Sequence, residues 1–184
     1  MKKIIIILSI LLAGLLGYMI ATAVNSEKDE LYTDSTQQAS IDKAVRSLVA
    51  EPDLELSLPS EPDDNILDKV TSGKVTYYLV LLPYKDKADK DFVGFIMKTD
   101  ERKGKWRTDR ISAFFNVNTK DRSTLETATY IYGSVEDPNN GTEVYFALGK
   151  APDDTNATAL GDRVSLDENG VFGVISTEQF SIAQ

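Results

Sequence analysis

The sequence predicts an α+β protein: an N-terminal membrane-spanning or signal helix, then one amphipathic helix packed on a mainly antiparallel β-sheet, with a β-rich C-terminal layer. Three kinds of segment predict this fold class. An uncharged apolar run opens the chain, and a single stretch near residues 36–50 has helical periodicity. Later apolar runs have the length of strands and end at turn residues.

The N-terminal segment decides the expected compartment. Lys2 and Lys3 precede residues 4–24, which are uncharged and long enough to cross a hydrocarbon core of about 30 Å as a helix. The basic end is expected in the cytoplasm and the rest of the chain outside it. Ala21 and Ala23 also match the small-residue pattern of a cleavage site. We therefore expect a single-pass protein of the cell membrane, or a secreted protein if the chain is cleaved after Ala23.

The remaining chain is expected to form one extracytoplasmic domain. Residues 1–24 are the signal peptide or anchor, and residues 25–35, which are polar and charged, are a predicted linker. Residues 36–184 are the predicted α+β domain, with a division into sub-domains 36–118 and 124–184 as an alternative. About 150 residues are enough for one buried core.

The composition excludes several classes of function. The chain has net charge −9 and contains neither His nor Cys. Such an acidic domain repels the phosphates of nucleic acids, so no nucleic-acid partner is expected. The lack of His excludes Ser–His and Cys–His catalysis and removes the commonest zinc ligand. Without Cys no disulfide can form, so stability must come from packing.

The helix is predicted to begin at Ser35, whose side chain would form a capping box with Gln38. Apolar residues then follow at the spacing of one helix face, up to about Ala50: Ile41, Ala44, Val45 and Leu48. Prolines interrupt the next segment, and the alternating leucines between residues 54 and 58 predict a short edge strand.

Strands are predicted after residue 74. Residues 75–82 and 92–97 are apolar on both faces, so the helix must cover one face and the C-terminal third the other. A third strand is predicted at Trp106–Val117, and its change of apolar phase predicts a β-bulge near residues 109–110. Further strands are predicted at 128–135 and 143–148. Asn169-Gly170 predicts a type I′ hairpin joining 164–168 to 171–175.

One basic stretch opposes the overall charge of the chain. Residues 98–110 hold six basic side chains and the only Trp. Lys103, Lys105, Trp106 and Arg107 are therefore candidate binding residues for an anionic polymer or glycan, with Trp106 as a stacking surface. The alternative is a hairpin with a charged solvent face and a core Trp. The alternation of Trp106 with its basic neighbours favours this alternative.

An acidic turn with Asn and Gly supplies the oxygen ligands that Ca²⁺ prefers. The candidate metal ligands are Glu136, Asp137, Asn139 and Asn140, although the same residue types are common in ordinary β-turns. No other cofactor is expected. Ser40 and Lys43 have the spacing by which a lysine can activate a serine, but both also fit beside the apolar face of an ordinary helix.

Several motifs resemble those of uncharacterised small exported or membrane-anchored proteins of Gram-positive bacteria. They are YYLVLLPY at 77–84, VGFI at 93–96, GKW at 104–106 and YIYGSVEDP at 130–138. The likeness covers roughly residues 40–148, and it implies no functional residues.

These observations favour a non-catalytic cell-envelope protein, a binding or interaction module at the membrane surface. Its expected partners are the membrane, through the N-terminal segment, and an envelope protein or polymer. The alternative is a carboxylate-dependent hydrolase that acts on cell-wall polymer or peptide, because Asp and Glu are abundant.

Overall fold

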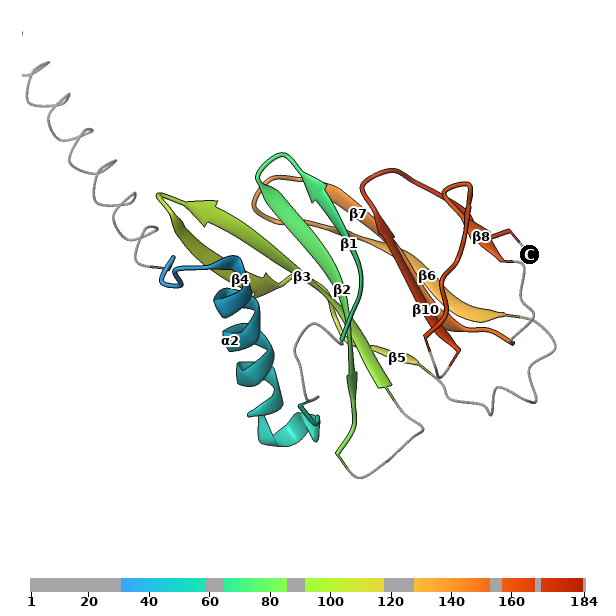
Figure 1. Cartoon of the computed structure of the whole chain (residues 1–184), viewed down its shortest axis with the longest axis horizontal. Coiled ribbons are helices and arrows are strands. Elements are labelled where there is room, and N and C mark those ends of the chain that lie inside the picture. Colours follow the sequence, from blue (N-terminus) through green and yellow to red (C-terminus); the bar gives the residue numbers. More distant parts are fainter. Residues whose placement is uncertain are drawn as a thin grey trace, which may run out of the picture.

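The computed structural model describes residues 31–58, 65–85, 92–117, 128–152, 157–167 and 170–183. In these residues a helix, a five-stranded sheet, a three-stranded sheet and a two-stranded hairpin are arranged as successive layers (Figure 1). The named strands pair antiparallel throughout. The prediction of one helix with a mainly antiparallel sheet is therefore confirmed.

The predicted membrane segment, residues 1–24, and most of the predicted linker lie outside the described residues. Among the helices that the structure describes, none is both long and apolar enough to cross a bilayer.

Helix α2 (Gln37–Val49) begins one residue later than predicted. Its N-cap is Thr36, whose hydroxyl accepts a hydrogen bond from the Ala39 N–H at 3.1 Å. The helix ends at Ala50 as expected, and its buried face packs on the first sheet. A 3₁₀ turn (Pro52–Leu54) follows. The predicted edge strand at 54–58 is reduced to a single antiparallel bridge between Leu56 and Tyr84, flanked by hydrogen bonds from Lys85 N–H to the Glu55 carbonyl at 2.7 Å and from Ser57 N–H to the Pro83 carbonyl at 2.9 Å. The side chain of Leu56 is buried.

The first sheet has the strand order β1-β2-β3-β4, and β5 also pairs with β3. Its strands are β1 (Ile66–Ser72), β2 (Val75–Pro83), β3 (Phe92–Arg102), β4 (Lys105–Arg110) and β5 (Phe115–Val117). The predicted third strand is thus two strands, which pair with opposite ends of β3. The irregularity lies at residues 111–114, not at 109–110. There the Ser112 hydroxyl replaces a ladder partner and accepts the Ile96 N–H at 2.8 Å.

The second sheet has the order β10-β7-β6, with β6 (Thr129–Glu136), β7 (Glu143–Lys150) and β10 (Val171–Ser176). A small hairpin, β8 (Thr158–Ala159) and β9 (Asp162–Arg163), lies beyond it. The predicted hairpin of 164–168 with 171–175 is wrong, because β10 pairs with β7. The chain does turn before β10, where the Gly170 N–H donates to the Asp167 carbonyl at 3.0 Å, but Asn169 lies outside the described residues.

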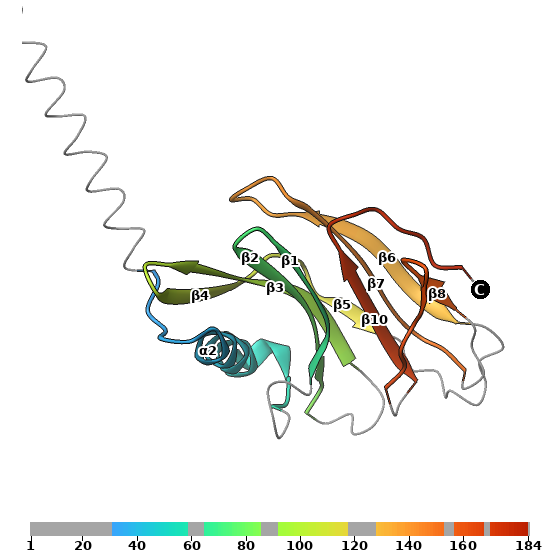
Figure 2. The same cartoon turned by 45° about the horizontal axis from the view of Figure 1, so that its top comes forward.

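Three buried clusters separate the layers. Alternate residues of β2 divide between two of them: Tyr78, Val80 and Leu82 face α2, whereas Tyr77, Leu79 and Leu81 face the second sheet. The third cluster lies between the second sheet and the segment that holds β8 and β9. Figure 2 shows α2 on one side of the first sheet and the second sheet on the other. The expectation that both faces of these strands are covered is therefore met.

The proposed boundary between sub-domains, residues 118–124, falls outside the described residues. The cluster between the sheets takes buried residues from both halves of the chain, including Ile96 from β3 and Phe146 from β7.

Candidate functional site

The β3–β4 hairpin carries the four candidate binding residues predicted from the sequence. Its two-residue turn is Lys103-Gly104, with φ of 53° and 74°, between the paired residues Arg102 and Lys105. Positive φ at both positions is the type I′ geometry, which matches the twist of a hairpin. Lys103 and Lys105 are exposed, and Trp106 and Arg107 are half-buried. Strand alternation places Lys105 and Arg107 on one face and Trp106 on the other.

Trp106 is not the fully buried core residue that the alternation favoured. It belongs to none of the three buried clusters. It lies on the same side of β4 as Thr108, whose hydroxyl donates to Ser40 near the start of α2 at 2.8 Å. Trp106 lies two residues nearer the hairpin turn than Thr108. This position is beyond the start of α2, so the helix does not cover it.

The first described residues, 31–34, run beside β4 (Figure 1), and Asp34 forms a bridge with Trp106. The Trp106 N–H donates to the Asp34 carbonyl at 2.8 Å, and the Asp34 N–H donates back to the Trp106 carbonyl at 3.3 Å. Burial and a hydrogen bond to Asp100 of β3 raise the pKa of Tyr32 to about 12. The chain therefore enters the domain along the edge of the basic hairpin.

Lys43 of α2 also contacts residues 31–34, where the chain enters the domain. Its ammonium lies 2.8 Å from the Thr33 hydroxyl and 3.5 Å from the Asp34 carboxylate. Ser40 is buried and accepts the hydroxyl of Thr108. Ser40 and Lys43 thus have separate structural partners, and no hydrogen bond joins these two described residues.

The predicted calcium ligands lie in the β6–β7 turn, where Asp137 points into the molecule. Its carboxylate lies 2.7 Å from the Lys98 ammonium, and it accepts the Tyr77 hydroxyl and the Asn139 N–H, each at 3.0 Å. The Asn140 amide donates to the Tyr77 hydroxyl at 3.1 Å. Burial alone would raise the pKa of Asp137, but the hydrogen bonds from Lys98, Asn139 and Tyr77 lower it.

These contacts occupy both carboxylate oxygens of Asp137, and the Thr142 N–H donates to the Asn140 side-chain oxygen at 2.8 Å. Within the described residues, no three Asp or Glu side chains converge as a metal site. Calcium binding by Glu136, Asp137, Asn139 and Asn140 stays a prediction.

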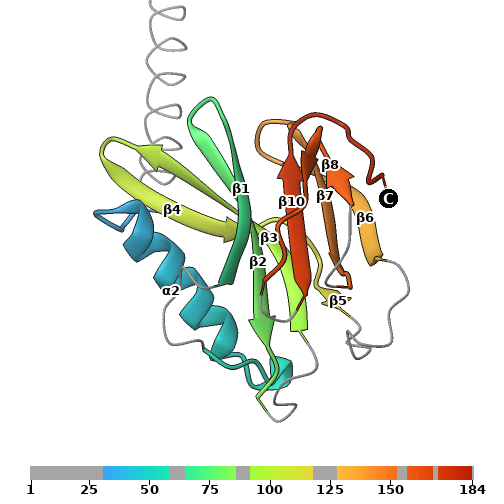
Figure 3. The ribbon, with the colours of Figure 1, turned by 45° about the vertical axis from the view of Figure 1, so that its right-hand side comes forward.

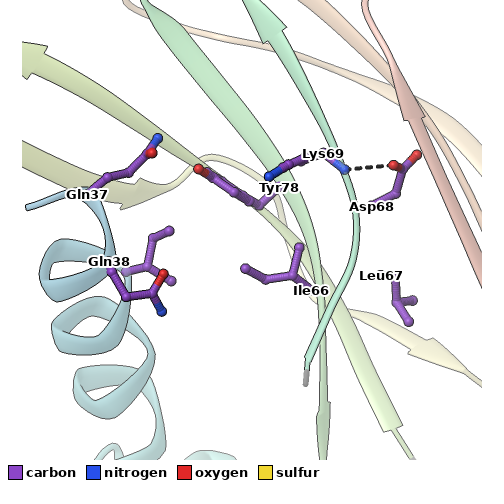
Figure 4. A pocket seen from close by; sticks show the side chains of 8 residues that line it. Gln37, Gln38, Ile66, Leu67, Asp68, Lys69 and Tyr78 are labelled. Atoms are coloured by element: carbon purple, nitrogen blue, oxygen red, sulfur yellow. Dashed lines mark hydrogen bonds between the residues drawn. The ribbon is translucent and has the colours of Figure 1, made fainter. Parts of the chain in front are cut away.

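A groove of about 450 Å³ lies between α2 and β1 (Figure 4). It exists because α2 packs chiefly on β4 and β3 and leaves part of the sheet beside β1 uncovered. Gln37 and Gln38 line the helix side, and Ile66 and Tyr78 line the sheet. The Asp68 carboxylate at its rim is already used, since it accepts the N–H groups of Lys69 and Ile175.

A smaller groove of about 280 Å³ lies between β5 and β6. Its apolar residues include Val117, Ile131 and Leu148, and Lys150 lies at one end. Neither Lys150 nor Tyr32 could be recognised from the sequence. No local pattern predicts a lysine that is largely buried at a strand end, and none predicts a tyrosine that forms a hydrogen bond with a neighbouring hairpin.

No protein-family model, no curated protein and no solved structure matches this chain. The resemblance to small exported proteins of Gram-positive bacteria stays a prediction.

Proposed function

We propose that this chain is a non-catalytic module of the cell envelope, anchored by residues 4–24, whose β3–β4 hairpin rests on the anionic headgroups of its own membrane. The observation that carries this proposal is the pairing of Asp34 with Trp106. It fixes the point at which the chain enters the domain, and that point is the basic hairpin.

The length of the connection supports this orientation. Six residues, 25–30, separate the proposed anchor from the first described residue. Even fully extended, they reach only about 20 Å. The domain therefore lies close to the bilayer, and the end that carries Leu31 and the hairpin turn is the nearest part of it.

The charge of the hairpin fits an anionic surface. Lys103 and Lys105 are exposed at and beside its turn, in a chain whose net charge is −9. An acidic domain tethered to an anionic membrane is repelled by it unless its basic end faces the headgroups. Each lysine near such a surface contributes about 1 kcal/mol, within a Debye length.

The test uses the full-length protein in vesicles and the fluorescence of Trp106, the only Trp in the chain. Quenching by a lipid with a quencher on its headgroup reports how close the hairpin lies to the surface. We expect strong quenching in vesicles that contain phosphatidylglycerol, and weaker quenching in vesicles of phosphatidylcholine alone.

Charge reversal supplies the control. Lys103→Glu with Lys105→Glu should abolish the extra quenching caused by phosphatidylglycerol. Arg46→Glu with Lys85→Glu, two exposed positions away from the hairpin, changes the net charge equally and should preserve it. If both double variants behave alike, the hairpin does not orient the domain.

A further inference from the structure

Strand β6 is an edge strand without the features that usually protect one. It is the last strand of the second sheet, on the side away from β1 (Figure 3). Natural edges carry charged residues, prolines or bulges that block pairing with another chain. Residues 129–135 contain no charge and no proline, and Tyr130, Ile131 and Tyr132 are each 39–40% exposed.

Lys150 lies beside the beginning of this edge. It is 9% exposed and is the cross-strand partner of Thr129. It lies on the same face of β7 as Leu148, toward the first sheet, where both residues line the groove between β5 and β6. Among the described residues, none forms a hydrogen bond or an ion pair with its ammonium group.

The side chain of Lys150 is largely buried, but its ammonium group still reaches solvent at the end of the groove. A cation held there without a counter-ion among the described residues can form a charge-assisted hydrogen bond with a ligand. Its natural counterpart is a carboxylate. The adjoining apolar surface of Val117, Ile131 and Leu148 suits an aliphatic side chain attached to the same ligand.

We propose that the β6 edge and this groove bind the C-terminal end of an extended peptide whose last residue is apolar. The peptide adds to β6 as an antiparallel strand through main-chain hydrogen bonds. This direction brings its C-terminus beside Thr129, where the terminal carboxylate pairs with Lys150 and the last side chain enters the groove. A parallel strand would bring an N-terminal ammonium group to the same place and would be repelled.

This proposal is independent of the membrane orientation, because β6 and the basic hairpin belong to different sheets. The test uses the full-length protein in detergent and a labelled peptide of alternating Thr and Val that ends in Ile. The peptide is made with a free C-terminal carboxylate and with a C-terminal amide, and binding is followed by fluorescence anisotropy. We expect the carboxylate form to bind about tenfold more tightly or better.

Lys150→Met should bind both forms equally, whereas Lys69→Met, at an exposed position on β1, should keep the preference. The thermal midpoint of Lys150→Met without peptide should be unchanged or higher, because the aliphatic part of the side chain is kept and the ammonium group has no partner among the described residues to lose. Three results would overturn the proposal: no binding of either form, equal binding by the native protein, or a lower thermal midpoint for Lys150→Met.

Discussion

Lys98 of β3 and Asp137 of the β6–β7 turn form an ion pair of 2.7 Å that joins the two sheets, with side chains only 2% and 0% exposed. Tyr77 donates to the same carboxylate from β2, so the contact involves two neighbouring strands of the first sheet. In a chain without Cys, this network and the hydrogen bond from the Ile175 N–H to the Asp68 carboxylate are polar connections between two sheets that meet mainly through apolar side chains.

Removing one member of the Lys98–Asp137 pair should lower the free energy of unfolding far more than removing both. Asp137→Asn leaves the Lys98 ammonium buried without its counter-ion and should lower the free energy of unfolding by about 3–5 kcal/mol. Adding Lys98→Met should recover most of this loss, because no buried charge remains. Urea unfolding of the three proteins checks the prediction. A double variant no more stable than Asp137→Asn would show that the pair does not act as a unit.

The same carboxylate predicts a loss of stability in acid. The pKa of Asp137 is lowered below its ordinary value of 3.8 in the folded protein, so the unfolded chain takes up the proton first. The stabilisation is fully present above that ordinary value and is lost as the pH falls through the folded-state pKa. Unfolding midpoints measured between about pH 6 and pH 3 should fall more steeply for the native protein than for Asp137→Asn. Parallel curves would contradict this account.

The raised pKa of Tyr32 leads us to expect a loss of stability at alkaline pH. Its pKa is raised from 10.0 to about 12 by burial and by Asp100, so its contribution is fully present below pH 10.0. That contribution is lost as the pH rises toward about 12, because the folded state resists ionisation of the phenol. Tyr32→Phe should lose less stability over this range, measured by unfolding at graded alkaline pH. An equal loss in both proteins would mean that the contact with Asp100 is not maintained.

Gly94 lies where the two sheets pack closely. A β-carbon at this position of β3 would overlap the buried side chain of Leu148 from β7. Gly94→Ala should therefore cost about 1–3 kcal/mol through overpacking, measured by chemical denaturation. Gly133→Ala is the matched control, since its β-carbon would lie 3.2 Å from the Phe146 ring and requires only a small adjustment. A larger cost at Gly133 than at Gly94 would contradict the packing described for these sheets.

The elements that could be predicted from the sequence are those with a regular pattern of apolar residues. The buried face of α2 follows helical periodicity, and β2 and β3 are apolar enough to be recognised as strands. Strand β1 was not predicted, because it carries Asp68 and Lys69. The Asp68 carboxylate is satisfied by the Ile175 N–H, a residue far away in the sequence.

Pairing between distant segments explains the other differences. Asn169-Gly170 is a good turn sequence, yet β10 is buried on both sides and pairs with β7 instead of its sequence neighbour. The alternation around Trp106 predicted a core position, but the residue lies beyond the start of α2, and no local pattern reveals where a helix begins relative to a neighbouring strand. Of the candidate sites, the basic hairpin was recognisable because its charge opposes that of the chain. The groove beside Lys150 was not, because three separate strands form it.

The most direct test of the membrane-facing hairpin compares two single-cysteine proteins, which the absence of native Cys makes possible. Glu101→Cys places a fluorophore beside the hairpin turn without removing a lysine, and Lys85→Cys places one near the opposite end of β3, about 30 Å away. Both proteins are reconstituted in vesicles that contain phosphatidylglycerol and a headgroup quencher. The account predicts strong quenching at position 101 and little at position 85. Equal quenching at the two positions, or stronger quenching at position 85, would contradict it.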